Sequence, residues 1–132
     1  LPAAPPLRMP KVLVVDDQPD NLLAMTAVLE TLDQELVNVS SGRDALKALL
    51  HHDDFAVIIM DVLMPQRDGW DLMVSLRAEQ STRDIPIIVC SVLREAQIAL
   101  SLGATSYLAK PVTEQALLEA LSPWSDLSPP RR

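Results

Sequence analysis

Three acidic residues and one lysine have the chemistry of a metal-assisted phosphoryl site. Each comes directly after an apolar run: Asp16 and Asp17 after 12–15, Asp61 after 55–60, and Lys110 after 107–109. A carboxylate at the end of an apolar strand is costly to desolvate unless something pairs with it. Close carboxylates attract a hard cation such as Mg²⁺, and an ammonium group attracts a phosphoryl oxygen. The residue types therefore predict a site for a divalent metal and a phosphoryl group.

The carboxylates divide into metal ligands and a nucleophile. We expect Asp17 and Asp61 to bind Mg²⁺ directly. The backbone carbonyl of Leu63 is the expected third protein ligand, and Asp16 would act through water. Asp61 is also the expected nucleophile, because a carboxylate can form an aspartyl phosphate while the metal offsets the charge of the transferred group.

Lys110 and Ser91 complete the predicted site, although each has a plainer interpretation when taken alone. The Lys110 ammonium would supply a compact positive charge to one phosphoryl oxygen, and the Ser91 hydroxyl would donate to another. An isolated lysine at a strand end more often extends toward solvent, and Ser91 could equally cap the helix that follows it. Asp16 and Asp17 could likewise be solvated acids near a helix N-terminus. The combination of all these residues favours the functional interpretation.

Apolar periodicity predicts the elements that position these residues. We expect strands at 11–15, 35–39, 55–60, 86–90 and 106–109, and helices near 19–32, 43–51, 70–79, 94–102 and 114–121. Ser41 and Thr113 are expected N-caps, and Gly103 is expected to end the fourth helix. Strands alternating with helices predict an α/β fold, with a doubly wound parallel sheet of five strands covered by five helices. Ligands of such sheets bind beyond the carboxyl ends of the strands, where the polar residues fall.

The bulk composition indicates one globular domain. The chain has 132 residues, 48% of them hydrophobic, and a net charge of −7. The length suits one domain, and the negative charge argues against direct binding to nucleic acid. Prolines cluster near both ends, so 1–9 and 123–132 are expected to be linkers around a domain at 10–122. The lack of a long apolar stretch and the single Cys90, expected in the core, predict a cytoplasmic protein without membrane insertion.

The ordered motifs resemble the receiver domain of two-component response regulators. The matching residues are Val14-Val15-Asp16-Asp17, Met60-Asp61-Val62-Leu63-Met64-Pro65 with Asp68-Gly69, Ser91, and Gly103-Ala104 leading to Tyr107-Leu108-Ala109-Lys110-Pro111. The resemblance implies the flavodoxin-like strand order 2-1-3-4-5. It also implies Mg²⁺-dependent transfer of a phosphoryl group to Asp61 from a histidine kinase or histidine phosphotransfer domain. In the implied switch, Ser91 moves toward the phosphoryl group and Tyr107 turns inward.

The leading interpretation is a signalling phosphoacceptor from a hybrid kinase or multidomain regulator. Its autophosphorylation and autodephosphorylation would be intrinsic, and it would not be a metabolic enzyme. The sequence leaves open whether the domain also contacts neighbouring domains of a parent chain or forms a homodimer. The main alternative is a phosphorylation-independent receiver-like interaction domain, because Val92 stands where the family commonly has a small residue and the segment from Ser91 to Lys110 is short for the family.

Two other classes fit the residues less well. A phosphatase with an aspartyl nucleophile would carry a second acid two positions after Asp61, where this chain has Leu63. A flavin carrier of the same topology would need an amide-rich and glycine-rich phosphate loop after its first strand, and here that loop is acidic.

Overall fold

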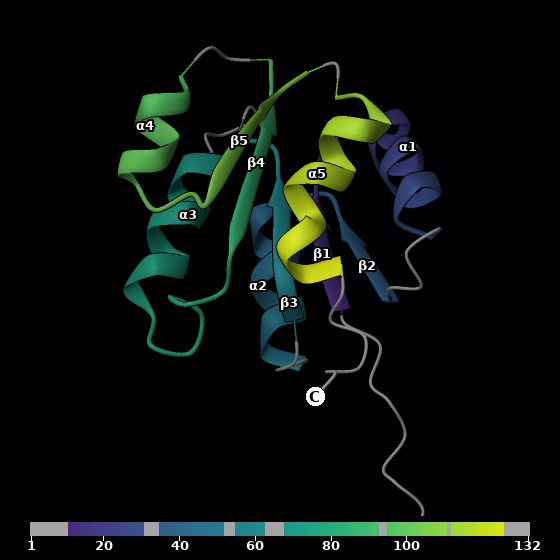
Figure 1. Ribbon diagram of the computed structural model, residues 1–132. Coiled ribbons are helices and arrows are strands. Elements are labelled where there is room, and N and C mark those ends of the chain that lie inside the picture. Colours follow the sequence, from purple (N-terminus) through teal and green to yellow (C-terminus); the bar gives the residue numbers. More distant parts are fainter. Residues whose placement is uncertain are drawn as a thin grey trace, which may run out of the picture.

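The computed structural model describes residues 11–30, 35–51, 55–62, 68–92, 95–110 and 112–125, which alternate between strand and helix (Figure 1). The elements are β1 Lys11–Val15, α1 Pro19–Glu30, β2 Glu35–Val39, α2 Gly42–His51, β3 Phe55–Met60, α3 Asp68–Ala78, β4 Ile87–Ser91, α4 Ala96–Ser101, β5 Ser106–Ala109 and α5 Glu114–Ser125. All strand pairs are parallel, and the strand order is β2-β1-β3-β4-β5. The predicted α/β fold and its strand order are confirmed.

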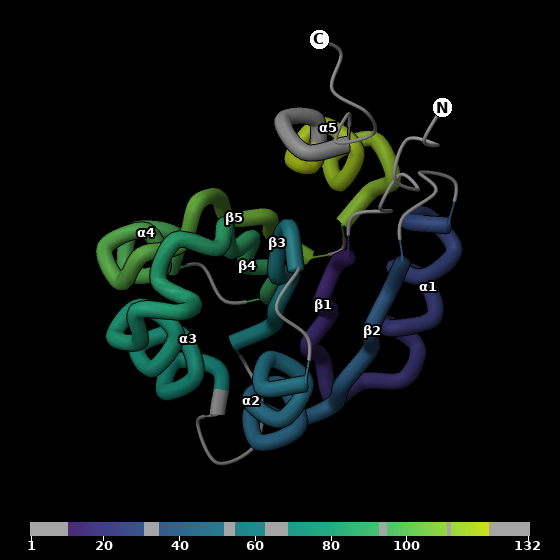
Figure 2. The backbone as a smooth tube through the Cα atoms, turned by 90° about the horizontal axis from the view of Figure 1, so that it is seen from below, coloured from purple at the N-terminus to yellow at the C-terminus, as the bar shows by residue number. Residues whose placement is uncertain are grey.

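Helices cover both faces of the sheet (Figure 2). Helices α1 and α5 pack on one face, and α2, α3 and α4 pack on the other. Successive residues of a strand point to opposite faces, so the central strands supply both cores. The core under α1 and α5 contains Val12, Val14, Val57, Ile59, Ile88, Cys90, Met25, Leu29, Leu117 and Leu121. Burial of each large aliphatic side chain contributes about 1.5–3 kcal/mol, which explains why β1, β3 and β4 are apolar along their length.

Two helices begin at the predicted N-caps. The hydroxyl oxygen of Ser41 accepts a hydrogen bond from the Asp44 N–H at 3.1 Å at the start of α2. The hydroxyl oxygen of Thr113 accepts one from the Ala116 N–H at 3.0 Å at the start of α5. Each bond satisfies a backbone donor that the first turn of a helix leaves without an intrahelical partner.

Gly103 ends α4, as predicted. Its φ of 114° lies in the region that side chains other than glycine rarely adopt. The Gly103 N–H donates to the Leu100 carbonyl at 3.1 Å, and the Ala104 N–H donates to the Ala99 carbonyl at 2.9 Å. This pair of bonds is a Schellman motif, which satisfies the last carbonyls of the helix and turns the chain toward β5.

Strand β4 and helix α4 differ from the prediction. Strand β4 ends at Ser91 rather than at Cys90, because Ser91 still pairs with Ala109 of β5. The interpretation of Ser91 as the N-cap of α4 is therefore wrong. Helix α4 begins at Ala96 and covers only Ala96–Ser101, after Glu95, whose side chain makes no capping hydrogen bond.

Two other helices, α3 and α5, also have one end that differs from the prediction. Helix α3 begins at Asp68 rather than Trp70, and the predicted end of α1 at Leu32 lies outside the described residues. Helix α5 runs to Ser125, whereas we expected it to end at Leu121. Residues 123–125 of the predicted linker are therefore helical.

Among the described helices, none is long and apolar enough to cross a membrane.

Candidate functional site

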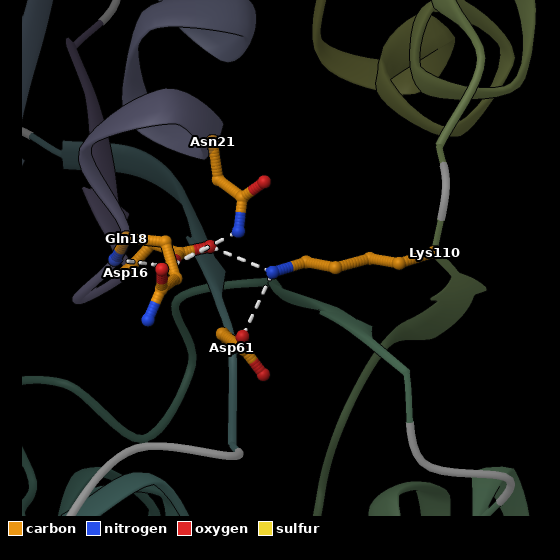
Figure 3. A network of polar contacts seen from close by, with 5 residues as sticks. All are labelled: Asp16, Gln18, Asn21, Asp61 and Lys110. Atoms are coloured by element: carbon orange, nitrogen blue, oxygen red, sulfur yellow. Dashed lines mark hydrogen bonds and ion pairs between the residues drawn. The ribbon is translucent and has the colours of Figure 1, made fainter.

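Asp16, Asp61 and Lys110 meet at the carboxyl edge of the sheet (Figure 3). Strands β1 and β3 are neighbours whose last residues pair, so the aspartates that follow them lie side by side. Lys110 follows β5 and reaches across the edge. Its Nζ lies 2.8 Å from Asp16 Oδ2 and 2.8 Å from Asp61 Oδ2. The topology thus brings together residues that are 94 and 49 positions apart in sequence.

This ion-pair cluster is largely buried. Asp16 is 3% exposed and Asp61 is 6% exposed, and the Lys110 side chain is 11% exposed. Burial acts to lower the pKa of Lys110, but the hydrogen bonds and charges of Asp16 and Asp61 outweigh it, so the pKa is raised above 10.5. Lys110 therefore carries a fixed positive charge at neutral pH and balances two buried carboxylates.

The second oxygen of Asp16 is held by the start of α1. The Gln18 N–H donates to Asp16 Oδ1 at 2.9 Å, and the Asn21 side-chain amide donates to the same oxygen at 3.4 Å. An aspartate bonded to the N–H two residues ahead forms a local turn that fixes its orientation. Sequence reasoning missed Asn21. The available signal was a side-chain amide in the first turn of the helix that follows Asp16.

Asp17 carries an oxygen that suits a metal ion. Its Oδ1 is buried and has no hydrogen-bond partner among the described residues. Such an atom is costly unless a cation or water satisfies it, and Mg²⁺ typically takes one or two carboxylates together with water. Asp17 and Asp61 therefore fit Mg²⁺.

The side chains of Asp16, Asp17 and Asp61 do not, however, form a complete set of metal ligands in this structure. Within the described ranges, no group of three or more histidine, cysteine or acidic side chains could hold a metal ion by itself. Asp16 and Asp61 each direct one oxygen to Lys110 instead. Leu63, the predicted carbonyl ligand, lies outside the described residues.

Ser91 and Tyr107 lie on the neighbouring strands β4 and β5. Ser91 is fully buried, and its carbonyl accepts a hydrogen bond from the Lys110 N–H at 2.9 Å. Tyr107 pairs with Val89, two residues before Ser91, so both side chains point to the face covered by α2, α3 and α4. The Tyr107 hydroxyl is buried without a hydrogen-bond partner in the described part of the chain. The two predicted switch residues therefore share one face of the sheet.

Gly69 lies close against Val62, the residue that follows Asp61. A Cβ atom at Gly69 would lie 2.2 Å from the Cα of Val62 and 2.6 Å from its carbonyl oxygen. Only glycine lets the first turn of α3 come this close to the residue next to Asp61. The Asp68-Gly69 pair was part of the sequence motif. The sequence alone, however, did not show that residue 69 must be glycine because it approaches the backbone of Val62.

A cavity of about 630 Å³ adjoins the site. It is lined at one end by Asp61, Lys110 and Val92 and extends between α1 and α5. Val92 is 59% exposed, as expected for a residue at the mouth of the site. Cys90, by contrast, is a buried core residue as predicted, because it is 1% exposed and burial raises its thiol pKa to about 12.

The sequence of this domain matches the response regulator receiver domain family over residues 12–122. The chain belongs to this family. Receiver domains are the phosphoacceptor modules of two-component signalling, and the parallel sheet with strand order β2-β1-β3-β4-β5 is the receiver fold.

Receiver domains of two kinds of protein are similar to this chain. It is 35% identical to the sensor protein GacS of Pseudomonas syringae in an alignment that covers 94% of this chain but 14% of GacS. It is 30% identical to the protein PilH of Pseudomonas aeruginosa in an alignment that covers 86% of this chain and 96% of PilH. The chain thus spans a small part of GacS and nearly all of PilH.

Solved receiver structures have the same fold. The receiver domain of the sensor histidine kinase PA1611 from Pseudomonas aeruginosa, with a magnesium ion in its active site cleft, is 28% identical with a TM-score of 0.79 and covers 90% of this chain and 99% of its own. The chemotaxis response regulator CheY4 of Vibrio cholerae is 29% identical with a TM-score of 0.80 and covers 88% of this chain and 98% of its own.

Proposed function

We propose that this receiver domain accepts a phosphoryl group on Asp61 from a phosphohistidine donor and then changes conformation. The observation that carries the proposal is the 2.8 Å contact between the buried Asp61 carboxylate and the Lys110 ammonium, beside an open cavity. The Asp61 carboxylate can serve as the nucleophile, and the neighbouring ammonium can receive the negative charge of the incoming group.

The transfer is an in-line displacement at phosphorus. An Asp61 oxygen forms the new P–O bond, and the P–N bond to the donor imidazole breaks, leaving its electron pair on nitrogen. Lys110 shifts one hydrogen bond from the Asp61 carboxylate to a phosphoryl oxygen. Ser91, at the end of β4, donates its hydroxyl to another phosphoryl oxygen. Asp16 stays bonded to Lys110 and holds the ammonium in place.

Asp17 and Asp61 would hold Mg²⁺ directly, with the Leu63 carbonyl as a third ligand and Asp16 acting through water. When bound, the ion offsets the charge of the transferred group and orients its oxygens. This assignment is supported by Asp17 Oδ1, which is buried and has no hydrogen-bond partner among the described residues. The magnesium ion in the PA1611 receiver domain also supports it.

The donor would be a histidine kinase or a histidine phosphotransfer domain, and the domain would also catalyse its own slow dephosphorylation. The likeness to a short part of GacS supports a multidomain parent, with residues 1–9 and those beyond α5 as connections. A cytoplasmic location follows from this role. Self-association as a homodimer stays a prediction.

Phosphoimidazole, a small mimic of phosphohistidine, tests the proposal. With Mg²⁺, wild-type protein should acquire an acid-stable, base-labile phosphoryl group, and Asp61→Asn should not. Asp20→Asn, which changes an exposed acid of α1, is the matched control and should be labelled like wild type. Failure to label the wild type would overturn the proposal and favour a phosphorylation-independent interaction domain.

A further inference from the structure

The cavity beside Asp61 has one reactive end and one apolar end. Asp61 and Lys110 line the reactive end, where the phosphoryl group would sit. From there the cavity runs between α1 and α5. These two helices lie on the same face of the sheet (Figure 2). Apolar side chains from both helices and from Val112, two residues before α5, line that part: Ala24, Met25, Val28, Val112 and Leu117.

Among the described residues, none closes the apolar part of the cavity completely. Leu117 and Met25 form its buried base, with 2% and 7% exposure, while Ala24 on α1 is exposed at its side. Its volume of about 630 Å³ falls in the range of about 300–1,000 Å³ that is typical of small-molecule sites. A ligand that fits both ends would carry a transferable phosphoryl group on a short apolar chain.

We propose that this cavity selects acyl phosphates with an apolar acyl chain of about four to eight carbons over acetyl phosphate, as direct phosphodonors to Asp61. The proposal rests on Asp61 being the phosphoacceptor. A small donor brings its leaving group into the site with it, so the acyl chain begins within one bond of the reacting phosphate. The chain is flexible enough to bend from there into the groove between α1 and α5.

Phosphoryl transfer from an acyl phosphate to Asp61 needs no further reactant. An Asp61 carboxylate oxygen forms a bond to phosphorus while the bond from phosphorus to the acyl oxygen breaks. The acid leaves as its carboxylate with the electron pair, so no proton has to move. Lys110 faces the phosphoryl oxygens, and the apolar walls contact only the acyl chain.

The size of the selectivity follows from burial. A methylene group that leaves water completely gains up to about fourfold in binding. Hexanoyl phosphate has four more methylenes than acetyl phosphate, and partial burial of these should raise kcat/KM at least tenfold. The gain should appear in KM at similar kcat, because the chain is held equally in the ground state and the transition state.

The test compares phosphorylation of the intact domain by acetyl, butyryl and hexanoyl phosphate with Mg²⁺. The three leaving carboxylates are about equally basic, so the donors differ little in intrinsic reactivity at phosphorus. The rate should rise from acetyl to hexanoyl phosphate in the wild type. Ala24→Glu, which puts a charge at the side of the groove, should bring the ratio of hexanoyl to acetyl rates close to one.

Leu23→Glu is the matched control. It adds the same charge to the next residue of α1, where the side chain is 70% exposed and does not line the cavity. It should keep the wild-type ratio. A wild-type ratio of one or less, or equal ratios in the two glutamate variants, would overturn the inference while leaving acceptance of phosphate on Asp61 intact. Failure of every donor to label the wild type would instead overturn the proposed function, and this inference with it.

Discussion

The side chain of Arg77 fills the space that a side chain at Gly103 would need. A Cβ atom at Gly103 would lie 2.7 Å from Arg77 Cγ and 2.8 Å from its Nε. From this position Arg77 donates to the Gly103 carbonyl through Nε at 3.0 Å and Nη2 at 2.7 Å. Its Nη1 donates to the carbonyls of Arg83 at 2.7 Å and Ile85 at 2.8 Å. One residue of α3 thus joins the loop before β4 to the turn before β5.

We predict that Gly103→Ala destabilises the domain by roughly 1–3 kcal/mol, because it combines a positive φ with a clash. In an Arg77→Ala background the same change should lower the free energy of unfolding by less, because only the backbone strain at residue 103 remains. Denaturant unfolding of the two single variants and the double variant gives this coupling directly. Equal costs in both backgrounds would show that Arg77 does not restrict residue 103.

Asp17 should contribute to metal binding but not to the stability of the metal-free fold. Asp17→Asn removes one of the neighbouring acidic charges and leaves the Lys110 ion pairs intact. Mg²⁺ affinity should therefore fall, while the melting temperature without metal should stay equal or rise.

Asp16→Asn is the matched control for that experiment. It removes a carboxylate that Lys110 and the Gln18 N–H both use, so it should lower metal-free stability by about 1.5–3 kcal/mol. Titration with Mg²⁺ and thermal unfolding measure both quantities. Unchanged Mg²⁺ affinity in Asp17→Asn would contradict the metal site.

Ser91 and Tyr107 should couple the phosphoryl site to the α4–β5 surface. Ser91→Ala keeps Asp61 and the metal ligands, so it should still accept phosphate. It should lose the shifts around Tyr107 that beryllofluoride, a phosphoryl mimic, induces in NMR spectra of the wild type. Shifts of wild-type size in the variant would count against the coupling.

Val92 should slow both phosphorylation by acetyl phosphate and loss of the phosphoryl group. Its branched side chain lines the cavity next to Asp61 and restricts the in-line approach of a donor or a water. A barrier lowered by about 0.7 kcal/mol in Val92→Ala would speed both reactions roughly threefold, with little change in Mg²⁺ affinity. A phospho-Asp61 half-life in Val92→Ala that equals or exceeds the wild-type value would show that residue 92 does not restrict access.

The sheet and the position of the acidic cluster could be predicted because they depend on strong local patterns. The runs at β1, β3 and β4 are apolar on both faces, which leaves few alternatives to central parallel strands. Parallel strands place their carboxyl ends at one edge, so the residues after β1, β3 and β5 had to lie along that same edge. Gly103 and the caps Ser41 and Thr113 are likewise local signals.

The parts that could not be predicted depend on contacts between distant segments. Pairing with β5 keeps Ser91 in a strand, where local sequence allowed a helix cap equally well. The carbonyls bonded by Arg77 and the backbone approach of Gly69 to Val62 come from tertiary packing. The pairing of Lys110 with Asp16 as well as Asp61 depends on side-chain conformations that spacing does not determine.

The most direct test of the account is the mass of the protein after incubation with Mg²⁺ and acetyl phosphate, followed by peptide mapping under acidic conditions. The wild type should gain the mass of one phosphoryl group, located on the peptide that contains Asp61, and Asp61→Asn should gain none. Equal labelling of both proteins, or a label on another residue, would contradict the assignment of Asp61 as the phosphoacceptor.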